Sequence, residues 1–445
     1  RPSGSGEPRP ASMAIPTRAR GLRGVYYGWW LLAGSIVAMT LGSGVSFWSV
    51  GLYIEPLESD FGWSRGEVSG AISIVLLTGG AAGPFVGRWV DTRGARKVIL
   101  FGAVTTAATY ILLATTTELW QWYVYSAING VFRQMMFFIP FQALISRWFD
   151  RRRGVALSIL GTGFSLGGVV VVPPMRLVVD NIGWEASFVF SAIAILVVFV
   201  PIGALLVRND PSDVGARPDG AAIPEGGVAP SRLTGLPLRA ALKTPHFWLI
   251  GIALTCFFFG LFGMLVHQIP LYESIGIPRD TAALIVSTAA LLGACSRVPF
   301  GFIGDRVERF EFVVIAMSIS LIFAMASLLF IPGYLGIGVY IAFWVVGTGG
   351  GPIMEAMLLT RMFGLAHFGT LLGAIVVIEE VGLVTSPTVV GWIYDVTGSY
   401  DLALVLFIGS FAASAMLFVV ILRLPRLRFE PARLQAPASH GGLDS

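Results

Sequence analysis

Five charged residues stand well inside long apolar stretches of this sequence: Arg133, Arg297, Glu355, Glu379 and Glu380. A charge in an apolar environment is costly, so such a side chain normally faces a cavity or an opposite charge. A guanidinium group can hold a carboxylate through two parallel hydrogen bonds, and a carboxyl group can take up and release a proton. These residue types are therefore suited to binding an organic anion and to moving a proton with it.

The elements that must position these residues are expected to be membrane-spanning helices. Of the 445 residues, 55% are hydrophobic and 13% are charged, whereas a soluble domain has about 25% charged residues. The predicted fold is an all-α polytopic membrane protein with twelve transmembrane helices, because twelve stretches reach the roughly 20 apolar residues that a span requires. They lie at about 28–54, 67–89, 97–116, 120–146, 154–178, 186–207, 246–269, 281–303, 312–334, 336–360, 370–394 and 402–423.

One connection between these stretches is long and rich in Gly, Pro and Ala, which predicts a flexible linker between two six-helix halves. Residues 1–12 precede the first Met and are interpreted as a disordered tail or a misplaced start, so they take no part in the fold prediction. The predicted divisions are a tail at 1–27, a first half at 28–207, the linker at 208–245, a second half at 246–423 and a tail at 424–445.

The distribution of basic residues predicts the orientation, since cytoplasmic loops carry an excess of Lys and Arg. The tails, the linker and the even-to-odd loops hold 25 of the 30 basic residues, and the opposite loops hold two, Arg65 and Arg279. Both termini are therefore predicted to be cytoplasmic, and the net charge of +4 does not indicate a nucleic-acid partner. The preference for Arg over Lys is typical of a GC-rich coding sequence, so we expect a bacterial inner membrane.

The two halves resemble each other when the chain is shifted along itself so that Asp91 falls on Asp305. Two similar halves joined by a linker are typical of transporters that expose a central site to each side in turn. The other pairs that match at the same shift are Gly87 with Gly301, Arg147 with Arg361, Phe149 with Phe363, Gly168 with Gly382 and Pro173 with Pro387.

The interior charges are distributed in a regular way, because every third span lacks one. The spans at 97–116, 186–207, 312–334 and 402–423 are therefore predicted to be peripheral, with the others surrounding a water-filled path. At about 1.5 Å of rise per residue, the buried arginines and the glutamate pair lie near one level, close to the middle of the membrane, where secondary transporters bind substrate.

Arg297 has two interpretations, binding of a substrate carboxylate or a structural ion pair with Glu379 or Glu380, and the two can alternate. One of these glutamates is the candidate proton carrier, with the structural pair as its alternative. Arg133 either contacts substrate or pairs across to 370–394, and Glu355 is assigned to gating or structure. His267 could bind substrate or titrate, although a single His near a helix end is more often just hydrogen-bonded.

The stretch 87–97 reads GRWVDTRGARK and places Asp91 at the C-terminal end of a span. The helix dipole opposes a carboxylate at that end, so Asp91 needs a cation or the N-terminus of another helix. The repeated G-x-x-x-D favours a latch between the halves over plain positive-inside anchoring. The residues assigned to this gate are Gly87, Asp91, Arg93, Arg96, Gly301 and Asp305, with Glu355.

This loop resembles the signature loop of the major facilitator superfamily, with Thr92 where that loop usually has Arg. The stretches YYGWW (26–30), FGWSRGEVSGA (61–71), RWFDRRRGVALSI (147–159) and GWIYDVTGSY (391–400) resemble its monocarboxylate transporter and oxalate:formate antiporter branch. The resemblance implies that Arg297 matches the branch's substrate-binding arginine. Two departures are Gly293, where animal monocarboxylate carriers have Asp, and the helix 370–394, which has glutamates where the antiporters have Lys.

These observations predict a proton-coupled transporter of a small organic anion, most simply a monocarboxylate, that lies in the lipid bilayer as a monomer and needs no cofactor. An exporter of amphipathic drugs or metabolites that uses the glutamates at 379–380 is the alternative within transport. A non-transporting sensor on the same fold is a second alternative. An enzyme is not expected, since the four His and two Cys form no metal-ligand pattern and no nucleotide-binding loop occurs.

Overall fold

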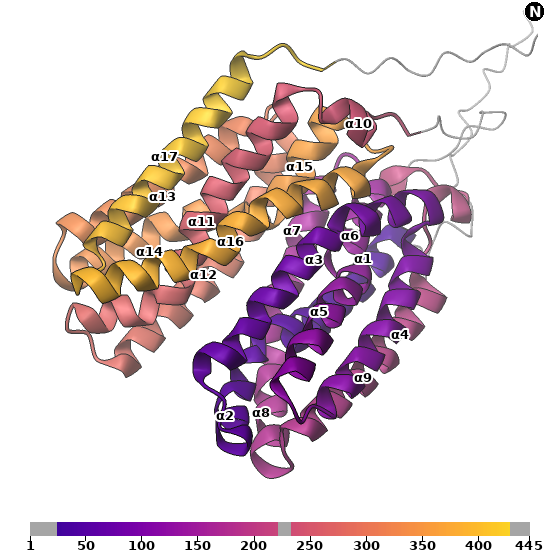
Figure 1. Cartoon of the computed structure of the whole chain (residues 1–445). Coiled ribbons are helices and arrows are strands. Elements are labelled where there is room, and N and C mark those ends of the chain that lie inside the picture. The colour runs from indigo at the N-terminus through magenta and orange to yellow at the C-terminus, as the bar shows by residue number, and fades with distance from the viewer. Residues whose placement is uncertain (1–24, 221–232, 428–445) are drawn as a thin grey trace, which may run out of the picture.

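The computed structural model describes residues 25–220 and 233–427, so the predicted tails and the middle of the predicted linker lie largely outside it. Within these ranges the chain forms two helical bundles, one from each half of the sequence (Figure 1). Eleven helical segments of the described chain are long and apolar enough to cross a membrane. The prediction of an all-helical polytopic membrane protein is therefore confirmed.

The first bundle is built from nine α-helices, several of which follow one another along a single span. A π-helical turn at Gly44–Trp48 and a 3₁₀ turn at Val50–Tyr53 join the first two helices. The helices are α1 (Tyr27–Ser43), α2 (Ile54–Phe61), α3 (Arg65–Arg93), α4 (Ala95–Ala114), α5 (Leu119–Met136), α6 (Phe138–Trp148), α7 (Arg153–Val170), α8 (Val172–Asn181) and α9 (Trp184–Pro201).

The second bundle follows a short helix, α10 (Leu238–Ala241), at the end of the predicted linker. The long helix α16 is interrupted in sequence by Pro387 but continues through it. The helices are α11 (Pro245–Ser274), α12 (Arg279–Arg306), α13 (Glu311–Phe330), α14 (Gly333–Gly349), α15 (Gly351–Phe363), α16 (Phe368–Thr397) and α17 (Asp401–Arg423).

One of the twelve expected spans, 120–146, is not among the helical segments that are long and apolar enough to cross a membrane. It consists of α5 and α6, which are separated at Phe137, where φ is −112° and ψ is −93°. Pro140 follows in the first turn of α6, and a proline there has no N–H to continue the preceding helix. The polar residues Asn129, Arg133 and Gln134 lower the hydropathy of α5. These three residues are buried inside the bundle, whereas Trp120 and Val124 of the same helix are exposed, so the neighbouring helices shield the polar face of α5.

The helices that the charge pattern predicts to be peripheral are so in the structure. Helices α4 and α9 pack on each other in the first half, and α13 and α17 do so in the second, with their main contacts inside their own half. Most contacts between the halves come instead from α3 with α16 and from α7 with α12, and fewer come from α6 and α7 with α15 and from α6 with α16. These four helices therefore form the boundary along which the candidate site must lie.

The end of the molecule that carries the basic loops and the linker is called the basic end below. Figure 1 shows the two bundles approaching each other toward this end, near α10, and diverging toward the end formed by α2 and α8. The described start of the linker packs on the first half, where the Asp219 carboxylate accepts backbone N–H groups of Arg151 and Asp150 at 2.6 and 3.1 Å. Its other end packs on the second half, through Leu236 and Phe363.

Candidate functional site

Arg297 lies inside α12 and reaches across the boundary between the halves. Its half-buried guanidinium donates a hydrogen bond from Nη1 to the carbonyl of Gly161 on α7 at 2.8 Å. A guanidinium has five N–H donors, and among the described residues no carboxylate lies within ion-pair distance of this one. The predicted structural pair with Glu379 or Glu380 is therefore not formed in this structure, and the charge is left uncompensated.

The two adjacent glutamates of α16 have different surroundings. Successive residues on a helix point about 100° apart, so only one of them can face the other half. Glu379 is 4% exposed, and its charge interacts with those of Glu380 and of Glu355, which is 5% exposed on α15. Glu380 is less buried and interacts with Arg133 of the first half. The pair is thus divided between the interior of the second half and the boundary.

Each of these three carboxyl groups has one buried oxygen, Oε2, without a hydrogen-bond partner among the described residues. Buried polar atoms in folded proteins are normally paired, and an unpaired one is costly. A proton shared between neighbouring carboxyl groups would supply a donor and remove a charge at the same time. The arrangement around Glu355, Glu379 and Glu380 is therefore chemically suited to holding protons.

Arg133 is 8% exposed and donates a hydrogen bond to a backbone carbonyl of the first span. Its Nη1 donates to the carbonyl of Ser46 at 3.0 Å, and its Nε has no partner among the described residues. Ser46 lies in the π-helical turn Gly44–Trp48, where the regular hydrogen-bond ladder of the first span changes; such turns occur often at functional sites. Arg133 thus ties the first span to α5 while its charge faces Glu380.

Two adjacent glycines of α3 make room for this charge pair. A side chain on Gly80 would place its Cβ 2.8 Å from Cγ of Glu380, and one on Gly79 would place it 3.8 Å from Nη2 of Arg133. Gly79 and Gly80 therefore lie next to Arg133 and Glu380, two charged residues that belong to opposite halves. The sequence prediction did not include Gly79 and Gly80, although a pair of adjacent glycines in the middle of the span 67–89 is a signal that could have identified them.

At the basic end, Asp91 closes the boundary between α3 and α16. Its carboxylate accepts hydrogen bonds from the backbone N–H groups of Gly369 and Thr370, at 3.0 and 2.7 Å, and from the Thr370 hydroxyl at 2.7 Å. Arg147 pairs with it at 3.4 Å. A carboxylate at the N-terminus of a helix is stabilised by the helix dipole. Asp91 therefore has both kinds of partner that the sequence predicts, a cation and the N-terminus of another helix.

Asp305 makes the corresponding contact in the repeat. It accepts hydrogen bonds from the backbone N–H groups of Gly154 and Val155, the second at 3.1 Å, at the start of α7. Arg361 donates to the carbonyls of Gly304 and Val307 on either side of it. The two halves are thus held together at the basic end by two similar carboxylate-to-helix contacts.

The glycines of the repeated motif allow the helices to approach this closely. A Cβ on Gly87 would collide with the backbone of Gly369, and one on Gly301 would lie 2.8 Å from Cα of Val155. Small residues let helix backbones meet in this way within membranes. Gly87 and Gly301 therefore lie at close helix-to-helix approaches across the boundary.

Arg93 and Arg96, which the sequence assigns to the same gate, are turned away from it. Arg93 stacks on the ring of Trp89, with 5.4 Å to the ring centroid, and Arg96 donates to the carbonyls of Gly203 and Ala204 at 3.1 and 2.6 Å. Both contacts stay within the first half. The cation that contacts Asp91 is Arg147 instead, and its match with Arg361 in the internal repeat was the available signal.

Arg147 also lies 3.9 Å from Asp210, which joins the latch to the start of the linker. Burial raises the pKa of the Asp210 carboxyl above its ordinary value, and the Arg147 guanidinium opposes that shift.

His267 lies apart from these residues, on α11. Its ring nitrogens contact the Tyr400 hydroxyl at 3.3 Å and the Pro387 carbonyl at 3.1 Å. Both nitrogens of His267 are thus occupied within the second half, as expected for a structural histidine.

Comparison with known proteins agrees with this architecture. Residues 35–374 match the family model described as Major Facilitator Superfamily. The chain is 25% identical over 410 residues to human monocarboxylate transporter 11, covering 85% of this chain and 80% of that protein. It is 23% identical over 295 residues to the oxalate:formate antiporter of Oxalobacter formigenes, covering 66% and 67%.

Among solved structures, the proton:xylose symporter XylE superposes with a TM-score of 0.70 over 90% of this chain and 96% of that one, at 13% identity. At this identity the likeness concerns the fold alone. The family match covers well over half of the chain and includes both carboxylate latches and the boundary charges up to residue 374. The chain therefore belongs to the major facilitator superfamily, and it is a secondary transporter of small solutes and not an enzyme.

Proposed function

We propose that the protein transports a small monocarboxylate together with a proton, by alternating access between its two halves. The observation that carries this proposal is the uncompensated charge of Arg297, which meets the other half through a single backbone carbonyl, Gly161. An anionic substrate would compensate that charge through the remaining N–H donors of the guanidinium, in the two-pronged geometry that suits a carboxylate. The relatives named as monocarboxylate transporters support the same substrate class.

The state of Arg133 supports a monocarboxylate over a dicarboxylate. A dianion would need a second free cation, but Arg133 already donates to Ser46 and faces the charge of Glu380. The oxalate:formate antiporter is related to this chain along two thirds of its length. Among the described residues along the boundary, Arg297 is the guanidinium without a carboxylate nearby, and a monocarboxylate needs only one such group.

Glu380 is the proton carrier in this proposal. It lies on the boundary, and its interaction with Arg133 joins the two halves electrostatically. A proton on Glu380 would remove that attraction, so that protonation and the movement of the halves become linked. Glu379 and Glu355 lie behind it, within the second half, and supply a further carboxyl pair through which a proton can pass.

We further propose that the basic end is cytoplasmic, because basic loops are retained on that side. The contacts of Asp91 and Asp305 then form the closed inner gate, and the substrate path opens to the other side of the membrane. Alternating access requires these contacts to break when the site opens inward. They are hydrogen bonds at helix ends, each of which contributes about 1 kcal/mol, so the closed state is reversible.

An exporter of amphipathic cations is the second candidate. It is favoured by the excess of carboxyl groups, since Glu355 and Glu379 have no cationic partner within ion-pair distance among the described residues. Such a protein would bind cations at these carboxylates and would not need Arg297. A sensor on the same fold would bind its ligand without transporting it.

The experiment is uptake by proteoliposomes of labelled lactate, pyruvate, acetate, formate and oxalate, with and without an inward proton gradient. Arg297→Gln is compared with Arg176→Gln, which removes an exposed arginine paired with Asp180 on α8. We expect gradient-dependent uptake of a monocarboxylate, its loss in Arg297→Gln and its retention in Arg176→Gln. Acid uptake that survives Arg297→Gln would contradict the role proposed for Arg297, and extrusion of lipophilic cations without uptake of any acid would replace this proposal with the second candidate.

A further inference from the structure

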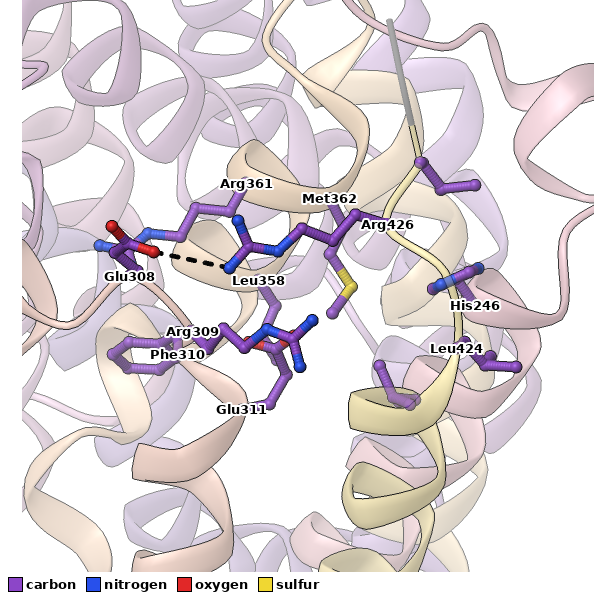
Figure 2. A pocket seen from close by; sticks show the side chains of 12 residues that line it. His246, Glu308, Arg309, Phe310, Glu311, Leu358, Arg361, Met362, Leu424 and Arg426 are labelled. Atoms are coloured by element: carbon purple, nitrogen blue, oxygen red, sulfur yellow. Dashed lines mark ion pairs between the residues drawn. The ribbon is translucent and has the colours of Figure 1, made fainter.

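A pocket outside the path between the halves opens at the basic end of the second half. Its volume is about 120 Å³, and its walls come from the start of α11, the α12–α13 connection and the ends of α15 and α17. Figure 2 shows the side chains that line it, with Arg426 reaching from the end of the described chain toward Glu308. The polar ones are His246, Glu308, Arg309, Glu311, Arg361 and Arg426.

The arginines that line the pocket differ in how many of their N–H donors already have a partner. Arg361 donates to two backbone carbonyls at the end of α12, beside the latch. Arg309 donates from Nη1 to the Leu422 carbonyl at 2.9 Å and has other N–H donors left. Arg426 has an ion pair with Glu308 at 3.6 Å, in which both side chains are well exposed. Exposed pairs of this kind are weak, so Arg309 and Arg426 have donors to offer a ligand.

His246 supplies a second, independent indication of a ligand. It lines the pocket but is only 5% exposed, and its Nδ1 has no hydrogen-bond partner among the described residues. A buried ring nitrogen without a partner is costly. An oxygen of a bound anion, with a proton between the two atoms, would satisfy Nδ1.

We propose that this pocket binds a phosphate group. Three arginines against two glutamates give the lining a net positive charge, and guanidinium groups match the several oxygens of a phosphate better than a point charge does. The volume of about 120 Å³ has room for a group of that size. The site lies where α13 and α17, the peripheral helices, end at the basic face. Basic pockets at this level of a membrane protein can receive lipid phosphates as well as soluble ones.

Glu308 has a definite part in this proposal. Its carboxylate forms an ion pair with Arg426, so it would compete with an incoming phosphate for the same guanidinium. Removing the competitor should tighten binding, whereas removing Arg426 should weaken it. A general electrostatic attraction to the basic face would not depend on Arg426 in particular, and this difference separates a site from a charged surface.

The test uses the purified full-length protein in a neutral detergent and two probes, inorganic phosphate and short-chain phosphatidylglycerol. Short-chain phosphatidylcholine and sodium chloride at equal ionic strength are the controls. Binding is measured by calorimetry and by the shift in the unfolding temperature. Arg426→Gln is compared with Arg423→Gln, which removes an exposed arginine in the last turn of α17 that does not line the pocket.

We expect one or both probes to bind, with affinity reduced about tenfold in Arg426→Gln, as expected for a lost charged hydrogen bond. Arg423→Gln should be unchanged and Glu308→Gln should bind more tightly. Binding of inorganic phosphate identifies a soluble ligand, and binding of phosphatidylglycerol alone identifies a lipid headgroup. Equal responses to chloride, or equal weakening in Arg423→Gln and Arg426→Gln, would overturn the proposal. None of these outcomes depends on which substrate is transported.

Discussion

Asp91 and Asp305 occupy equivalent positions in the two halves and make the same kind of contact, each accepting backbone hydrogen bonds from the first turn of a helix in the opposite half. Each carboxylate stands at the end of its own helix, where the dipole disfavours it, and gains from the dipole of the helix it meets. The contact therefore exists only while the halves are together at the basic end. This pair of contacts makes the closure of the gate testable.

Replacing Asp91 or Asp305 with Asn should shift the protein toward the conformation that is open at the basic end. Each change removes the charge that the opposite helix stabilises, at a cost of about 1 kcal/mol, or roughly a fivefold change in the population of the closed state. Spin labels at the exposed positions Arg93 and Glu308 would report this as a longer distance between the halves.

Asp219→Asn is the control for this experiment, because Asp219 also accepts backbone N–H groups near the start of α7 but belongs to the same half. The label distance should stay unchanged in that variant. If the distance is the same in all the variants, the two carboxylates do not hold the gate.

Gly87→Ala should prevent closure at the basic end. The added methyl group would collide with the backbone of Gly369, which cannot move aside as a flexible side chain could. Gly66→Ala, at the other end of α3, is the matched control, since the nearest atom to its Cβ is 3.9 Å away. Accessibility of the boundary to a thiol reagent from each side of the membrane would be measured. A Gly87→Ala protein that closes normally would contradict the close packing described here.

Arg297→Lys should keep the charge of the site but lose much of its affinity for the substrate. A lysine cannot form the two parallel hydrogen bonds of a guanidinium, so we expect transport at low substrate concentration to fall roughly tenfold to a hundredfold. The loss should appear mainly in KM and should be smaller than in Arg297→Gln. Equal activity of Arg297→Lys and the unmodified protein would indicate that only the positive charge matters.

Glu380→Gln should separate proton coupling from substrate exchange. The amide keeps the shape of the side chain but cannot carry a proton, so exchange of labelled for unlabelled substrate should continue while gradient-driven uptake is lost. Glu379→Gln changes the adjacent residue, which is more deeply buried than Glu380, and should impair coupling less. Loss of coupling in Glu379→Gln alone would move the proton site into the interior of the second half.

Much of this protein could be predicted from its sequence, because a bilayer imposes strong local rules. Hydropathy alone locates the spans, and the missing interior charges identify α4, α9, α13 and α17 as peripheral. The exception, 120–146, deviates because α5 carries polar residues that its neighbours bury. The internal repeat and the position of Asp91 at a helix end were sufficient to predict that its partner is a cation or the start of another helix.

The partners of individual charges were decided only by the tertiary structure. Sequence spacing does not fix the rotation of a helix about its axis, and a turn of about 100° separates Glu379, which is buried, from Glu380, which lies beside Gly80 of the other half. The same freedom gives Arg297 a carbonyl partner, Gly161, where a carboxylate was one of the two expectations. Composition and periodicity therefore determined which residues lie in the membrane and at what depth, while the packing of glycine faces between the halves decided which of them meet.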